Sequence, residues 1–253
     1  MTGVVKQLRS EVVRLQIRLY ACRERLVAHT DTEALHDLRV AVRRLRSLLK
    51  PLKGVAGSDQ LQERAKQVGR LTSPLRDQEV LVAQLRQLGE HEAAERRLPQ
   101  LLRGYHAVAV AAALPALFRA LDAWPRELAR LQAAGELDDL DKQVQRYLKK
   151  QRKRLLQALG DPQHDRHRTR LLVKRVRYTA QAYPELFSLP KAQMKALKAT
   201  QGAIGDWHDL QQWLGRAELE EDLQHLQVVW QRTLVDAQQH ADQVQARLLE
   251  VLS

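Results

Sequence analysis

The sequence predicts an all-α fold made of two repeats of four helices each, and three observations support this prediction. Good helix formers such as Ala, Leu, Gln, Arg and Glu dominate the composition, whereas 11 Gly and 8 Pro are few for an all-β chain of 253 residues. Apolar residues recur at helical spacing in segments that end at Pro or Gly. A His/Arg motif at residues 36–46 returns at residues 167–177. We therefore expect one domain over residues 1–253, with repeats at residues 1–135 and 136–253.

The repeated motif has the pattern H-x-x-R-x-x-x-[RK]-R-x-R. Its first copy lies in HDLRVAVRRLRSLLKPLK at residues 36–53, and its second lies in HRTRLLVKRVRY at residues 167–178. At ~100° per residue, basic residues of the first copy fall in one stripe on a helix and its apolar residues fall on the opposite face. We expect the apolar face to pack on a core and the stripe to face an anion. The predicted stripes are His36, Arg39, Arg43, Arg46 and Lys50 in the first copy, and His167, Arg170, Lys174 and Arg177 in the second.

Two helices are expected at the start of the chain. Apolar residues at helical spacing predict the first over residues 4–28. Thr30 and Glu33 have the spacing of a capping box and therefore predict the start of the motif helix. This second helix is expected to end near Pro51 because proline interrupts the helical hydrogen-bond ladder.

Prolines are expected to shape the rest of the first half. A third helix is predicted from residue 58 or 59 to about Leu88, and Pro74 is expected to kink it or split it in two. The fourth helical region, residues 90–134, contains Pro99, Pro115 and Pro125, so we expect it to be bent or broken.

The second half predicts a similar order of helices. Residues 138–158 form a predicted helix with a dense run of Lys and Arg that no acid interrupts between residues 142 and 154. The second motif helix follows and is expected to end near residues 184–190. Two further helices are expected over residues 191–216 and 219–252, and the last of them is acidic.

The repeat extends beyond the motif helix. The motif histidine and a later aspartate are 41 residues apart between His36 and Asp77, and 42 apart between His167 and Asp209. Leu75-Arg76-Asp77 aligns with Trp207-His208-Asp209, and Lys66 aligns with Lys198. Duplicated helical repeats usually pack about a pseudo-twofold axis, and in that arrangement the two stripes would face one groove.

The charge of the chain predicts a polyanionic partner. Its 42 Lys and Arg exceed its 30 Asp and Glu, giving a formal charge of +12. Nucleic acid, an anionic membrane and an inorganic phosphate polymer all match such an excess. The basic residues outside the stripes that we take as secondary candidates are Arg14, Arg18, Lys66, Arg146, Lys149, Lys150, Lys153 and Lys198.

Cysteine usage and hydropathy favour a cytoplasmic protein. Cys22 is the single cysteine, so an intrachain disulfide is excluded and a reducing compartment fits. No apolar segment with a small-residue cleavage site opens the sequence. The longest apolar run, Ala107 to Phe118, is interrupted by Pro115 and is too short to span a bilayer, which favours a buried helix. We expect no membrane association.

The two halves together resemble the CHAD domain family, the conserved histidine α-helical domain. The resemblance rests on H-x-x-R-x-x-x-R-R-L-R and a later L-R-D, then H-x-x-R-x-x-x-K-R-x-R-Y and Q-G-x-I-G-D-x-H-D, and covers roughly residues 4–250. It implies two four-helix bundles with pseudo-twofold symmetry and polyphosphate binding by both stripes in a basic central groove. For some members it also implies association with polyphosphate granules. The sequence GDWHD at residues 205–209 departs from SPLRD in the first half, so the halves need not be equivalent.

The leading interpretation is a non-enzymatic polyphosphate-binding protein that uses no cofactor. Arginine forks pair bidentately with phosphate oxygens, and arginines three or four residues apart rise ~4.5 to 6 Å along a helix. Such a row suits a linear polyanion. The alternative is nonspecific binding of RNA or DNA, although Tyr178 is the only aromatic residue inside either motif. An enzyme on phosphate chains would need a carboxylate cluster that holds a divalent metal, and the sequence shows none.

The sequence leaves the role of the repeated histidines open and predicts a supporting role for the repeated aspartates. His36 and His167 begin the stripes and either donate to phosphate or make structural hydrogen bonds. A metal site is disfavoured because it needs three or four converging ligands. Asp77 and Asp209 are expected to pair with basic residues and hold their forks in place, in preference to acid–base chemistry. The sequence does not indicate the oligomeric state or the preferred polyphosphate length.

Overall fold

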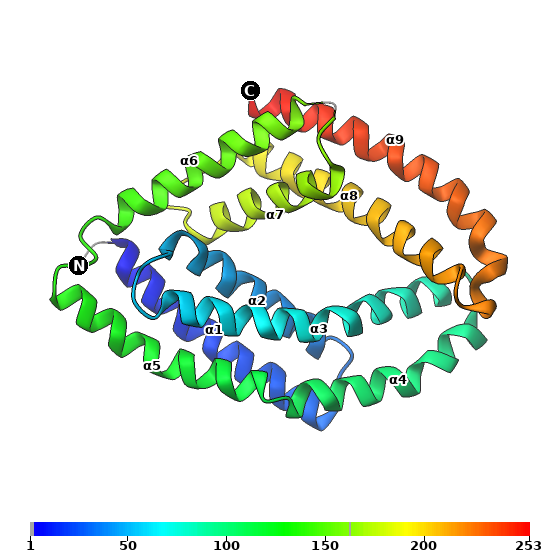
Figure 1. The fold of residues 1–253 in the computed structure, drawn as a ribbon, viewed down its shortest axis with the longest axis horizontal. Helices are drawn as coiled ribbons and strands as arrows, with labels where there is room; N and C mark the ends of the chain where they lie inside the picture. Colours follow the sequence, from blue (N-terminus) through cyan, green and yellow to red (C-terminus); the bar gives the residue numbers. More distant parts are fainter. Residues whose placement is uncertain (1–2, 162) are drawn as a thin grey trace. The chain divides into compact units, whose positions relative to one another are not determined.

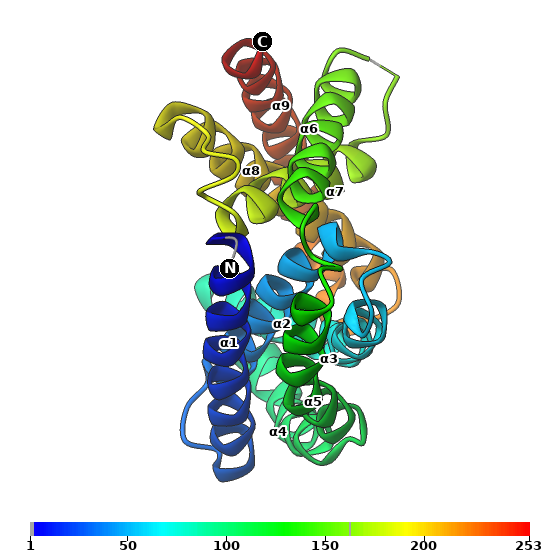
Figure 2. The same ribbon diagram turned by 90° about the vertical axis from the view of Figure 1, so that its left-hand side faces the viewer.

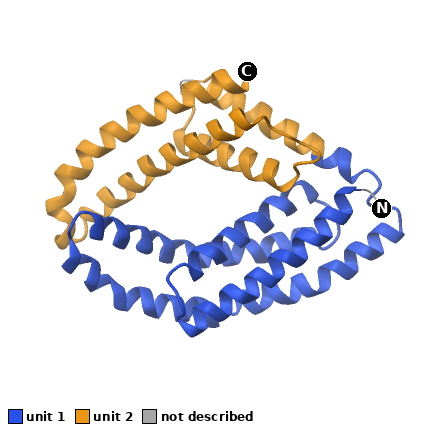
Figure 3. Ribbon diagram, turned by 180° about the vertical axis from the view of Figure 1, so that it is seen from behind, with its two compact units in different colours: residues 1–144 blue, residues 145–253 orange. Residues whose placement is uncertain are grey.

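The computed structural model describes residues 3–161 and 163–253. All regular structure within these residues is helical, in nine α-helices and two short 3-10 helices, which confirms the predicted all-α class. The chain divides into two compact units, residues 1–144 and residues 145–253, coloured blue and orange in Figure 3. The boundary lies inside helix α6 (Leu140–Leu159). The internal duplication stays a prediction, as do the repeat limits at residues 135 and 136.

Unit 1 packs five complete helices around one apolar core. Helices α1 and α3 each contact α2, α4 and α5, as Figures 1 and 2 show. Gly57 lies in the turn before α3 with a φ of 73°, a backbone conformation that glycine adopts without strain. The elements are α1 (Gly3–Ala28), α2 (Ala34–Leu49), the 3-10 helix η1 (Lys50–Leu52), α3 (Ser58–Gln87), α4 (His91–Val110) and α5 (Ala113–Ala133).

Helix α2, the first motif helix, buries its apolar face as predicted. Leu38, Leu45 and Leu48 are fully buried against α1 and α3. The predicted capping box is wrong: the Asp31 carboxylate, and not the Thr30 hydroxyl, accepts a hydrogen bond from the Glu33 backbone N–H at 2.9 Å. An aspartate two residues before a backbone N–H makes this local bond readily, so Asp31 orders the turn into α2.

In unit 1, helix α3 continues through Pro74, whereas the fourth helical region breaks before Pro115. Helix α3 runs through Pro74 without interruption from Ser58 to Gln87, so the alternative that Pro74 splits it is wrong. The fourth region does break as predicted, at Ala111 and Ala112, and Pro115 follows in the first turn of α5, where proline is best tolerated. The stretch His91–Ala133 has the length and apolar composition of a membrane span, and 39% of its most apolar window is buried.

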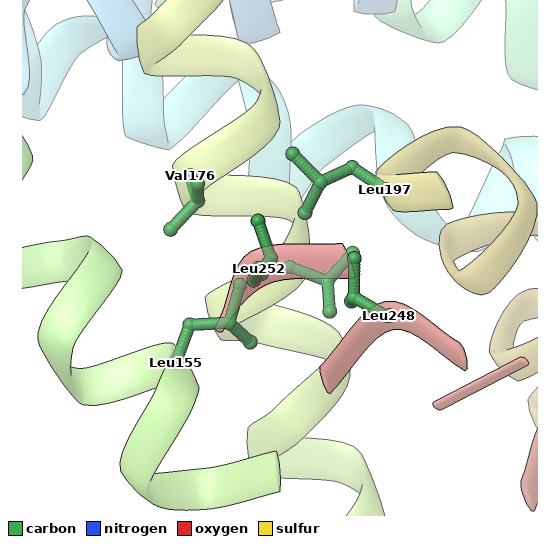
Figure 4. Packing of buried hydrophobic residues seen from close by; sticks show 6 residues of the cluster. Leu155, Val176, Leu197, Leu248 and Leu252 are labelled. Atoms are coloured by element: carbon green, nitrogen blue, oxygen red, sulfur yellow. The ribbon is translucent and has the colours of Figure 1, made fainter. Parts of the chain in front are cut away.

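Unit 2 contains the rest of α6 and three further α-helices. Helix α8 packs along both α7 and α9. Leu155 of α6, Val176 of α7, Leu197 of α8 and Leu248 of α9 meet in one buried cluster (Figure 4). The elements are α7 (Arg166–Ala182), α8 (Lys191–Ala217), the 3-10 helix η2 (Glu221–Leu226) and α9 (Gln227–Leu252).

One aligned pair of motif arginines holds each motif helix to the helix that precedes it. Arg44 of α2 donates to both carboxylate oxygens of Glu11 on α1, at 2.9 and 3.2 Å, and Glu11 is buried. Arg175 of α7 donates to the side-chain oxygen of Gln151 on α6 at 3.1 Å. These two arginines therefore act in packing, which separates them from the stripe arginines beside them.

We predict that Asp37 stabilises unit 1 through its charge. Arg25 and Arg18 of α1 donate to its carboxylate at 2.7 and 2.8 Å, and these hydrogen bonds lower its pKa. A lowered carboxyl pKa adds stability that is present above the unfolded value of about 3.9 and is lost as the pH falls through the folded pKa. Asp37→Asn should therefore lower the free energy of unfolding by about 1 kcal/mol at pH 7, measured by urea titration.

The difference between the Asp37 variant and the wild type should narrow as the pH falls below about 4, where the wild-type carboxylate also becomes protonated. Asp122→Asn is the matched control, because the Asp122 carboxylate accepts hydrogen bonds from the neutral Gln16 and Tyr20 side chains. Equal stability of wild type and Asp37→Asn at pH 7 would show that the charge of Asp37 does not stabilise the fold.

Candidate anion-binding surface

Helix α2 presents a row of cationic side chains along one face. Arg43 is exposed, while His36, Arg39 and Arg46 are half-buried where α2 packs on α3. The regular helix ends at Leu49, so Lys50 lies in the 3-10 turn that follows and is half-buried. The predicted spacing of ~100° per residue thus holds for the first four residues of the stripe, which lie on the α-helix. Lys50 follows them in a 3-10 turn, which has a different backbone geometry.

Arg39 is fixed in place by helix α3. Its guanidinium Nη1 donates to the Thr72 hydroxyl at 2.9 Å and to the Ser73 hydroxyl at 3.2 Å. Burial lowers the pKa of Arg39 below its ordinary value, and the Asp77 carboxylate acts in the opposite sense. The Asp77 charge therefore favours the charged guanidinium, in line with the supporting role expected for this aspartate. The Nη1 group of Arg39 is thus held in one orientation by neutral acceptors.

Arg46 occupies a position that a glycine of α3 leaves open. A Cβ at Gly69 would lie 3.3 Å from Nη1 of Arg46, which is closer than most van der Waals contacts. Burial and the neighbouring charge of Arg70 both lower the pKa of Arg46. Two arginines from two helices therefore converge here, and the Glu63 carboxylate acts on Arg46 in the opposite sense. Like charges held together while partly buried mark a place where an anion is stabilised.

The second motif helix presents the corresponding residues on α7. His167 is exposed, and Arg170, Lys174 and Arg177 are half-buried. Arg177 donates through Nη1 to the Gln201 side-chain oxygen of α8 at 2.9 Å, and its guanidinium lies 5.1 Å from the ring centre of Tyr178. As with Arg39 in unit 1, a neutral acceptor on the next helix orients a stripe arginine without neutralising it.

Arg46 and Arg177, which align in the two motifs, share one further feature. The Nε–H group of each is buried and has no acceptor among the described residues. A buried donor without an acceptor costs roughly 1 to 3 kcal/mol. Phosphate oxygens are acceptors that match the edge of a guanidinium, so an anion would supply the missing partner once the side chain moves enough to expose this Nε–H.

The secondary candidates divide into engaged and exposed residues. Arg18 is paired with Asp37 at 2.8 Å and Lys66 with Glu63 at 3.1 Å. Arg14 is exposed, with the Glu11 carboxylate 4.0 Å away. The remaining candidates, Arg146, Lys149, Lys150, Lys153 and Lys198, are exposed on α6 and α8. Because solvent screens exposed charges, the half-buried stripe residues are the stronger candidates for anion ligands.

Three residues beside the stripes of the two units were not among the candidates chosen from the sequence. Arg70 and Arg76 of α3 add charge next to Arg46 and Arg39, respectively. His208 of α8 lies beside His167, with ring centres 5.4 Å apart. The repeated LRD and WHD sequences pointed to positions 76 and 208. Arg70 carried no such signal, because it becomes part of the surface only through the packing of α3 on α2.

Acidic groups on the same surface are few. The described residues contain no group of three or more His, Cys, Asp and Glu side chains that could hold a metal ion. The one acid of α2, Asp37, is engaged by Arg18 and Arg25 of α1, and α7 contains no acid. Helices α2 and α7 thus carry positive potential that acids of the same helices do not cancel.

Comparison with known proteins gives a family match and matches to solved structures. The family model of the CHAD domain matches residues 11–218. The crystal structure of the CHAD domain from the plant Ricinus communis is similar to this chain with a TM-score of 0.69 and 25% sequence identity. The match covers 98% of this chain and 90% of the plant chain. No curated protein sequence matches.

We predict that the hydroxyl of Thr72 supports anion binding through Arg39. Thr72→Val keeps the shape of this fully buried side chain and removes the oxygen that accepts from Arg39 and donates to the Val68 carbonyl. The variant should lose about 1 kcal/mol of stability, measured by urea unfolding. It should also bind anionic chains more weakly than wild type, because Arg39 becomes less well oriented.

Thr200→Val is the matched control for this prediction. Thr200 is fully buried on α8 and donates to the Val244 carbonyl of α9 at 3.1 Å, so it stabilises unit 2 without contacting a stripe arginine. Its variant should lose a similar amount of stability and keep its affinity for anions. Equal affinities of the two variants would argue against an orienting role for Thr72.

Proposed function

Since the chain belongs to the CHAD domain family, we propose that it binds inorganic polyphosphate along the cationic stripes of α2 and α7 and does not cleave it. The observation that supports this proposal is that each stripe contains a half-buried arginine whose guanidinium is oriented by a neutral acceptor on the next helix. Arg39 with Thr72 and Arg177 with Gln201 are the clearest cases. The proposal includes the basic groove expected from the sequence, which both stripes would face.

Polyphosphate matches these stripes in charge and in repeat. Each interior phosphate carries about one negative charge and offers only acceptor oxygens, and guanidinium groups offer only donors. Arg39, Arg43 and Arg46 stand at successive turns of α2, so their Cα atoms rise ~4.5 to 6 Å from one to the next. A flexible chain of phosphates with one charge per monomer can place a phosphate at each of these arginines.

Nucleic acid is the alternative ligand, and the aromatic side chains argue against it. Proteins that bind single strands usually stack bases on exposed aromatic rings. Tyr178 lies against the guanidinium of Arg177, and Trp207 lies against that of Arg166. Trp124 and Trp230 are buried. Competition between polyphosphate and RNA at fixed ionic strength separates the two ligands, and we expect polyphosphate to displace RNA.

Cellular location follows from the same proposal. The family resemblance implies that some members associate with polyphosphate granules. A polyphosphate-binding protein in the cytoplasm would meet its ligand at such granules. We therefore propose a cytoplasmic protein that is recruited to such granules. Fluorescence microscopy of the tagged chain in cells that accumulate polyphosphate tests this location.

We predict that both stripes contribute to the affinity for long polyphosphate. Arg43→Ala/Arg46→Ala and Lys174→Ala/Arg177→Ala should each weaken binding by an order of magnitude or more, because each charge-assisted hydrogen bond contributes about 1.5 to 3 kcal/mol. The loss should be larger for long chains than for short ones, since a polymer that is long enough to reach a second stripe gains effective concentration. Isothermal titration calorimetry with polyphosphates of defined length measures both effects.

Arg119→Ala/Arg126→Ala is the control of equal charge change, because both arginines are exposed on α5 of unit 1. It should bind nearly as wild type once salt screens long-range attraction. Thermal melting confirms that each variant is folded. If both stripe variants are folded and bind long polyphosphate as tightly as the control, the stripes are only solvated helix faces.

A further inference from the structure

His208 differs from its counterpart in unit 1 in both chemistry and surroundings. It aligns with Arg76, which donates to the Glu79 carboxylate at 2.8 Å. At the same spacing after His208, the sequence has Gln211, which carries no charge. Glu79, the acid that pairs with Arg76 in unit 1, therefore corresponds to the neutral amide Gln211 in unit 2.

His208 is partly buried, and the charged groups that act on it lie on α7. The ring of His167 on α7 lies with its centre 5.4 Å from that of His208 and is tilted by 51°. Arg170 and Lys174 of the same helix also act on His208 electrostatically, and α7 packs directly on α8. Together with burial, these neighbours lower the pKa of His208 to about 4. Its imidazole is therefore neutral at pH 7.

The remaining titratable and polar groups near this part of α8 do not offset the electrostatic effect of the α7 residues on His208. Gln212 lies one turn along α8, with its amide nitrogen 3.4 Å from Nε2 of His208. Asp209, the next residue of α8, is not among the charged groups that shift the pKa of His208. From α9, His240 acts on Asp206, and Asp242 pairs with Arg166.

We propose that His208 is a further ligand of the anion in unit 2 and that it takes up a proton from solvent when phosphate binds beside His167, Arg170 and Lys174. This inference rests on the proposed function. A bound phosphate adds negative charge that offsets the cationic Arg170 and Lys174, and its oxygen accepts a hydrogen bond from the new imidazolium N–H. Both effects favour the protonated ring. Unit 1 has no such coupling at the aligned position, because Arg76 is already charged.

The sign of the pH dependence follows from this coupling. Binding raises the pKa of His208, so the bound state holds more protons than the free state at pH values between the two pKa values. The affinity for polyphosphate should therefore rise as the pH falls from about 7.5 to 5.5. By linkage, one full proton changes the affinity by at most about tenfold per pH unit.

Calorimetric titration with polyphosphate of defined length tests this inference. At pH 6, titrations in two buffers with different ionisation enthalpies give the number of protons taken up on binding. We expect uptake by wild type and a clear reduction in His208→Gln, which keeps a polar group of similar reach. His106→Gln on the exposed surface of α4 is the control and should take up as many protons as wild type.

The outcomes separate this inference from the proposed function. Saturable binding with equal proton uptake by wild type and His208→Gln overturns the role of His208 and leaves polyphosphate binding intact. The absence of saturable binding by wild type overturns both. If His208→Gln is unfolded, NMR titration of the wild-type His208 ring takes its place. Its pKa should rise when polyphosphate is added, and an unchanged value would overturn the inference.

Discussion

Like charges along one helix face repel each other, and the packing of the opposite face is what keeps α2 and α7 in place against that repulsion. Repulsion between like charges one turn apart is on the order of 0.2 to 0.5 kcal/mol per pair. Each fully buried leucine of α2, such as Leu38 or Leu45, contributes about 1.5 to 3 kcal/mol. Arg44 and Arg175 add polar contacts to the preceding helices. The stabilisation from apolar packing is therefore larger than the repulsion between the stripe cations, and it holds these cations close together.

The next helix in each unit orients these cations without cancelling their charge. Arg39 donates to the hydroxyls of Thr72 and Ser73, and Arg177 donates to the amide oxygen of Gln201. A carboxylate at these positions would hold the guanidinium more strongly and would also neutralise it. Neutral acceptors leave the positive charge of these two arginines uncancelled, and under the proposed function they are oriented before the ligand arrives.

The sequence predicted what depends on periodicity and missed what depends on packing between helices. The all-α class, the buried face of α2 and the break before Pro115 follow from local patterns and were confirmed. The capping box failed because Asp31 competes with Thr30 for the same turn. The continuity of α3 through Pro74 reflects neighbours that surround the helix and that no local rule contains. Arg70 likewise joins the surface only when α3 lies beside α2, so spacing within one helix could not identify it.

Whether a phosphate chain lies along the stripes is tested most directly by NMR of the arginine Nε–H groups during titration with polyphosphate. The Nε–H groups of Arg46 and Arg177 are buried without acceptors among the described residues. We predict that their resonances, with that of Arg39, shift as ligand is added. Those of Arg119 and Arg126 on α5 should stay unchanged. Equal small shifts at all of these arginines would indicate diffuse attraction to a basic protein and would contradict binding at the stripes.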